Sequence, residues 1–123
     1  MSMMNKLGNC HNVYQGTEKR VLCVCSAGLL RSPTMARVLA ETYNYNTRAA
    51  GITEEYALID VNDVLIEWAD EIVVAEDWMG VEIMKRFPSV TKCISLDLSD
   101  IYERMSPNLV KLIKDRYEKN SMA

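Results

Sequence analysis

The stretch Val21–Ala40, VLCVCSAGLLRSPTMARVLA, decides the fold. Its first four residues, Val21–Val24, are short, apolar and rich in β-branched side chains, which is typical of a buried strand. After Cys25 comes a loop with one glycine, and Ser32 and Pro33 then resemble the N-cap and first residue of a helix over Pro33–Tyr43. The sequence therefore places a thiol where a buried strand gives way to a helix.

Outward from this stretch, short apolar runs alternate with amphipathic segments. We predict strands at Val21–Val24, Thr47–Ala50, Glu71–Ala75 and Cys93–Leu96, and helices at Pro33–Tyr43, Asp60–Ala69, Trp78–Phe87 and Ser106–Tyr117. This β-α alternation predicts a three-layer α/β domain, in which helices flank a four-stranded parallel sheet with right-handed crossovers. We expect this domain over residues 19–123, preceded by a flexible N-terminal tail over residues 1–18.

Composition narrows the class of protein. The chain has 123 residues, 49% of them hydrophobic and 25% charged, as in an ordinary soluble domain. A net charge of −3 argues against nucleic acid or an anionic membrane as partner, because both attract positive surfaces. There is no bilayer-spanning run and no signal-peptide pattern, and the four cysteines are too few for a secreted disulfide framework. We therefore expect a cytoplasmic protein.

Polar and reactive side chains gather where the predicted strands end. Cys25 follows the first strand, Glu76 and Asp77 follow the third, and Asp97 to Asp100 follow the fourth. In open parallel α/β sheets, ligands bind outside the carboxyl ends of the strands. The sequence therefore predicts a site on this edge.

The loop after Cys25 has the chemistry of an oxyanion cradle. Backbone N–H groups before a helix attract anions, and a glycine permits their close approach. Arg31 adds a planar fork that can hold two phosphate oxygens, while Ser32 can donate a hydrogen bond to the Cys25 sulfur. The positive environment favours a nucleophilic thiolate. The predicted phosphate-binding residues are Ser26, Ala27, Gly28, Leu29, Leu30 and Arg31.

The segment VLCVCSAGLLRSPTMARVL resembles the nucleophile loop of the low-molecular-weight protein tyrosine phosphatases, and more closely a small bacterial and phage branch of predicted phosphatases. The resemblance continues in RAAG at Arg48–Gly51, in WADEIVVAED at Trp68–Asp77 and in LDLSDIY at Leu96–Tyr102. It spans the chain from Arg20 to Tyr117.

This resemblance implies a metal-independent phosphate monoester hydrolase that needs no cofactor. Its substrate would be a phosphorylated protein, with phosphotyrosine favoured, or a small phosphate monoester, and its product inorganic phosphate. Cys25 would be the nucleophile, and Asp100 would act as general acid and then as base, with Asp97 as the reserve assignment. Tyr102 would line the substrate pocket, and Trp78 is interpreted as either core or pocket rim.

The sequence departs from the family pattern in three places. Gly28 stands where the family often has a bracing asparagine, and Leu30 where it often has a second, protective cysteine. The usual Asp-Pro of the acid loop is Asp100-Ile101, which lacks the rigidity of a proline.

Four alternatives stay open from the residues. The segment VCSAG also resembles the phosphocysteine loop of sugar phosphotransferase IIB subunits, which relay phosphate but lack an equivalent of Arg31. An arsenate reductase on the same scaffold would need further cysteines, and Gly80–Lys92 has none. A zinc site from Cys10, His11, Cys23 and Cys25 would have poor tetrahedral spacing. A phosphopeptide reader without catalysis is the fourth.

Overall fold

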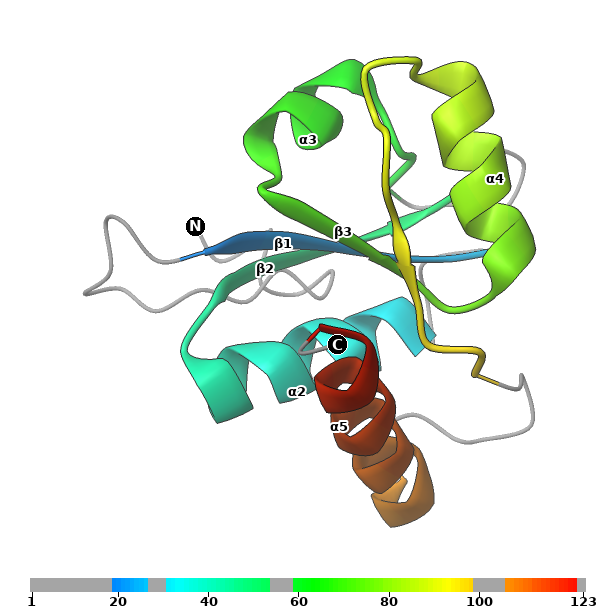
Figure 1. Cartoon of the computed structure of the whole chain (residues 1–123). Helices are drawn as coiled ribbons and strands as arrows, with labels where there is room; N and C mark the ends of the chain where they lie inside the picture. The colour runs from blue at the N-terminus through cyan, green and yellow to red at the C-terminus, as the bar shows by residue number, and fades with distance from the viewer. Residues whose placement is uncertain (1–18, 27–30, 54–58, 99–105, 122–123) are drawn as a thin grey trace.

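A parallel sheet of four strands organises the chain, with helices on both faces (Figure 1). The computed structural model describes residues 19–26, 31–53, 59–98 and 106–121. The strands are β1 (Arg20–Cys25), β2 (Asn46–Gly51), β3 (Glu71–Val74) and β4 (Ile94–Ser95), in the order β2-β1-β3-β4. The helices are α2 (Arg31–Tyr43), α3 (Asp63–Trp68), α4 (Asp77–Arg86) and α5 (Pro107–Ser121).

The layers follow from the apolar pattern of the strands. In Figure 1, α2 and α5 lie on one face of the sheet, and α3 and α4 lie on the other. The central strand β1 is covered on both faces, so its residues from Val21 to Cys25 are all buried. This explains why the strand is a continuous apolar run instead of an alternating one. The predicted α/β fold class and parallel sheet are confirmed.

Register places the candidate site at one edge. Cys25 at the end of β1 pairs with Gly51 of β2, and Val24 pairs with Val74 of β3. Val74 in turn pairs with Ser95 of β4. All four strands thus end on the same side, which is the edge that Cys25 occupies.

The starts of two helices, α5 and α2, test the capping predictions made from the sequence. The prediction of Ser106 as N-cap and Pro107 as first helical residue is confirmed, because the Leu109 backbone N–H donates to Ser106 Oγ at 3.2 Å. The prediction that the helix after the first strand begins at Pro33 is wrong, since α2 begins at Arg31. Pro33 fits there because N–H groups of the first turn have no acceptor within the helix.

The helix α3 is shorter than the predicted helix Asp60–Ala69, and Leu65 is its buried residue. It begins after Asn62, whose Oδ1 accepts from the Leu65 backbone N–H at 3.0 Å. Leu65 is buried, whereas its neighbour Val64 is 71% exposed. Six residues make less than two turns, and only a narrow strip of such a helix can face the sheet.

Candidate active site

The nucleophile candidate Cys25 is the last residue of β1 and is only 3% exposed. The backbone around it is fixed by the segment after β2. The Ile52 N–H donates to the Cys25 carbonyl and the Thr53 N–H to the Ser26 carbonyl, each at 2.9 Å. These bonds extend the parallel ladder one step past the strand and set the direction in which the chain leaves it.

The thiol of Cys25 contacts Ser32 across the loop. The Cys25 Sγ lies 3.2 Å from Ser32 Oγ, and Ser32 is fully buried. In this contact the thiol donates and Ser32 Oγ accepts, so donation from Ser32 to a thiolate stays a prediction. Ser32 is the second residue of α2 and not its N-cap, so the capping role expected from the sequence is wrong. A hydroxyl in this position can donate a charge-assisted hydrogen bond to a thiolate.

Arg31 begins α2 and is 2% exposed, so it is a buried residue of the site. Its Nη1 donates to Glu76 Oε2 at 2.5 Å and to the Leu98 carbonyl at 2.9 Å. A buried guanidinium is stable only when it is paired and hydrogen-bonded. The residues after β3 and β4 supply these partners, which brings three strand ends together around Arg31.

Glu76 is the residue whose part in the site the sequence did not assign. It is the N-cap of α4, but its side chain makes no capping hydrogen bond. One carboxylate oxygen accepts from Arg31, and the other accepts from Trp78 Nε1 at 3.3 Å. Its position at a strand end was a signal for the site, whereas its pairing with Arg31 had no sequence signal. Trp78 is 48% exposed, so of its two interpretations the core one is wrong.

Asp97 lies near the same edge but faces α5. Its backbone is left-handed, with φ 53°, and its side chain is 85% exposed. The Arg116 Nη1 donates to the Asp97 carbonyl at 2.9 Å and lies 3.8 Å from its Oδ2. Among the described residues, Asp97 has no hydrogen bond to Cys25, Arg31 or Ser32. These contacts are those of a turn residue that joins β4 to α5.

Several predicted site residues lie outside the described residues. They are Ala27, Gly28, Leu29 and Leu30 of the loop, and Asp100 and Tyr102 of the acid loop. Their roles stay predictions.

The other described cysteines lie in different environments. Cys23 is buried in β1, and burial raises the pKa of the half-buried Cys93 to about 11. Over residues 19–26, 31–53, 59–98 and 106–121, no group of three Cys, His, Asp or Glu side chains is placed to hold a metal ion. Cys10 and His11 lie outside these ranges.

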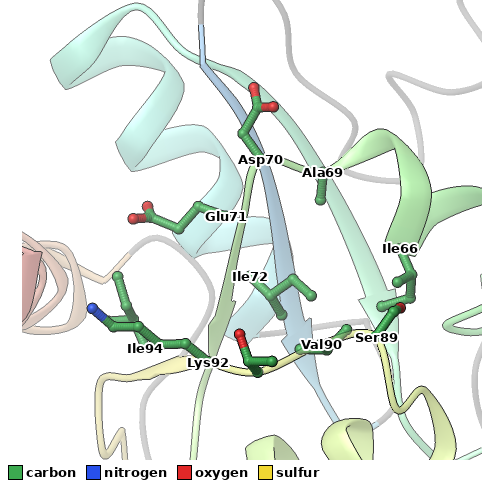
Figure 2. Close-up of a pocket in the computed structure, with 10 residues that line it drawn as sticks. Ile66, Ala69, Asp70, Glu71, Ile72, Ser89, Val90, Lys92 and Ile94 are labelled. Atoms are coloured by element: carbon green, nitrogen blue, oxygen red, sulfur yellow. The ribbon is translucent and has the colours of Figure 1, made fainter.

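A separate cavity of about 330 Å³ opens at the other edge of the sheet, where β3 begins. Figure 2 shows Ile66, Ile72, Val90 and Ile94 around it. The two carboxylates that line it, Asp70 and Glu71, pair with Arg20 and Lys19. The hydrogen bonds from Arg20 hold the pKa of Asp70 below its usual value. Because this cavity adjoins the start of β3, it lies at the opposite end of the strands from Cys25.

Two solved structures share the fold. The YwlE arginine phosphatase from Geobacillus stearothermophilus matches with a TM-score of 0.63 and 19% identity, over 85% of this chain and 93% of that chain. A YwlE mutant from Bacillus subtilis matches with a TM-score of 0.55 and 19% identity, over 82% and 92%. No family model and no curated protein sequence matches the chain. The likeness confirms the fold predicted from the low-molecular-weight phosphatase resemblance.

Within the described part of the chain, no helix combines the length and hydropathy needed to cross a bilayer.

Proposed function

We propose that this protein is a cysteine-dependent phosphate monoester hydrolase that works through a phosphocysteine. The observation that carries the proposal is the buried contact between Cys25 Sγ and Ser32 Oγ, with Arg31 one residue before Ser32. It brings a nucleophile, a donor for its negative charge and a bidentate cation to one strand end. The fold shared with two phosphatases supports the same assignment.

The reaction proceeds in two displacements. The Cys25 thiolate attacks phosphorus, the bond to the leaving oxygen breaks, and Asp100 gives that oxygen its proton. A water molecule then attacks phosphorus and passes a proton back to Asp100, the P–S bond breaks, and phosphate leaves. Arg31 and the backbone N–H groups of residues 26–31 neutralise the equatorial oxygens. Ser32 stabilises the sulfur as it departs.

The proposed substrate class is phosphotyrosine on protein. A second class, phosphoarginine, is favoured by one observation, that a structure sharing this fold is described as an arginine phosphatase. The two differ in the bond that breaks, P–O or P–N, and in the charge beside it. Trp78, half exposed next to Glu76, offers an aromatic face suited to an aryl ring.

The test is phosphate release from a phosphotyrosine peptide, a phosphoarginine peptide and p-nitrophenyl phosphate, each with EDTA present. We expect turnover by the wild type, faster on the phosphotyrosine peptide than on the phosphoarginine peptide, and none by Cys25→Ser. Cys93→Ser is the matched control, because Cys93 is the half-buried thiol outside the site, and it should keep wild-type rates.

Substantial turnover by Cys25→Ser would contradict the covalent mechanism. Faster phosphate release from the phosphoarginine peptide would overturn the assignment of phosphotyrosine as substrate, but it would leave the proposed hydrolase activity standing. A long-lived phosphocysteine in the wild type would instead indicate a phosphate relay, and loss of turnover with EDTA would show a metal requirement.

A further inference from the structure

Glu76 stands at the N-cap of α4, but its side chain is hydrogen-bonded to other side chains and not to the helix backbone. A short side chain such as that of aspartate at a helix N-cap accepts hydrogen bonds from the first backbone N–H groups, whereas glutamate is not among the preferred N-cap residues. Glu76 occupies that position at the start of α4 and makes no such bond. Both of its oxygens are turned to other side chains, one to Arg31 and one to Trp78. Its orientation is therefore explained by the site and not by the helix.

Two acceptors hold the same nitrogen of Arg31. The Nη1 donates to Glu76 Oε2 and to the Leu98 carbonyl, and the side chain is 3% exposed. Fixing one nitrogen of a planar group at two points fixes the plane of the whole group. The edge formed by Nε and Nη2 is the one that binds two oxygens of a phosphate side by side. The direction of that edge is set once Nη1 is held.

The charge of Glu76 makes this arrangement informative. A carboxylate beside an anion site repels the anion, so by electrostatics alone its removal strengthens phosphate binding. By geometry, its removal loosens Arg31 and weakens the hold on the transition state. The two effects have opposite signs in kcat/KM and can be told apart.

We propose that Glu76 is the positioning residue for Arg31, and that Trp78 holds Glu76 in place from the rim of the site. The inference rests on the proposed phosphatase function. It adds a residue that acts through Arg31 and does not itself touch the substrate. It also links the phosphate grip to the side chain that would meet the rest of the substrate, since Glu76 contacts both Arg31 and Trp78.

Glu76→Gln and Glu76→Asp test this inference with p-nitrophenyl phosphate and with orthophosphate as competitor. The first removes the charge and keeps the length, and the second keeps the charge and withdraws the carboxylate. We expect kcat to fall about tenfold in both, the size of one lost charge-assisted hydrogen bond. Trp78→Phe, which removes the indole N–H, should lower kcat about threefold.

Glu82→Gln is the matched control. Glu82 lies on the same helix, pairs with Arg86 at 2.6 Å and has a side-chain exposure of 34%, against 37% for Glu76. It should leave kcat and the orthophosphate inhibition constant unchanged.

The outcomes separate the two proposals. If wild type does not hydrolyse p-nitrophenyl phosphate, the proposed function falls, and calorimetric titration of orthophosphate still reports whether Glu76 orients Arg31. If wild type is active and Glu76→Gln keeps its kcat while binding orthophosphate more tightly, Glu76 only competes for Arg31 and the positioning role is wrong. An unchanged kcat in Glu76→Asp overturns it as well, and an unchanged kcat in Trp78→Phe removes Trp78 from the proposal.

Discussion

Replacing Ser32 by alanine removes one hydroxyl from the buried face of the proposed nucleophile. The Ser32 Oγ lies 3.2 Å from Cys25 Sγ, and the two residues are 0% and 3% exposed, so water cannot take the place of the lost donor. A hydrogen bond to a charged group contributes about 1.5–3 kcal/mol. At about 1.4 kcal/mol for each factor of ten, the thiolate loses stabilisation equivalent to about 10- to 100-fold in rate.

This loss falls on the second step of the proposed mechanism. In the first step the thiolate is the attacking group, and a less stabilised thiolate still attacks well. In the second step the same sulfur is the leaving group, so its departure slows. We therefore expect Ser32→Ala to lower kcat about 10- to 100-fold and to accumulate phosphocysteine. Rapid mixing with p-nitrophenyl phosphate should show a burst of p-nitrophenol followed by slow turnover.

Ser95→Ala is the control for loss of a buried hydroxyl, on a residue that is itself partly exposed. Its Oγ is buried without a hydrogen-bond partner in the described part of the chain, so its removal should leave kcat unchanged and stabilise the fold by about 1 kcal/mol. A kcat of Ser32→Ala within twofold of the wild type would refute the reasoning. So would an equal slowing of the burst and the steady state, because the hydroxyl would then act on both steps.

Three further predictions concern other groups. Asp100→Asn should slow the hydrolysis of phenyl phosphate far more than that of p-nitrophenyl phosphate, because a general acid matters most for a poor leaving group. Asp97→Asn should slow both reactions modestly and equally. The reverse pattern would exchange the roles of the two residues. Iodoacetate at neutral pH should alkylate Cys25 and spare Cys93, because burial raises the pKa of the Cys93 thiol to about 11. Orthophosphate should protect Cys25 from alkylation. Peptide mapping by mass spectrometry measures the labelling, and labelling of Cys93 before Cys25 would contradict this prediction. Burial, and then the hydrogen bond to Glu118, raises the pKa of Tyr43 from 10.0 to about 12. The folded state therefore holds the phenol proton more tightly than the unfolded state does, and this contribution to stability is lost as the pH rises from 10 to 12. Tyr43→Phe should therefore lose less stability than the wild type between pH 10 and 12 in urea unfolding, and parallel curves would rule this out.

The fold could be predicted because its signals are local. Residues Val21 to Val24 form a short apolar run, as a strand covered on both faces must, and amphipathic segments mark the crossovers between strands. The boundaries of a strand could not be predicted where they depend on hydrogen bonding to the neighbouring strand. The strand predicted at Cys93–Leu96 is only Ile94–Ser95, because its register depends on how far it follows β3.

The candidate site divides in the same way. Cys25, Arg31 and Ser32 lie within one loop and helix start, so residue types and spacing were enough to bring them together. The partners of Arg31 were not predictable, because the Leu98 carbonyl has no side-chain signature and no spacing in the sequence links Glu76 to Arg31. Only the tertiary arrangement brings these distant segments to one guanidinium.

The partners of Arg31 also determine when the proposed site can be completed during folding. Arg31 is 45 residues from Glu76 and 67 residues from Leu98 along the chain, and these contacts close only after β3 has joined β1 and β4 has joined β3. Contacts between residues so far apart in sequence form slowly, because long loops must close first. A chain with β1, α2 and β2 in place would hold Cys25 and Ser32 together without the clamp on Arg31. After dilution from denaturant, helical signal should therefore return before hydrolysis of p-nitrophenyl phosphate does, and the docking of the last strand should be the step that completes the proposed active site.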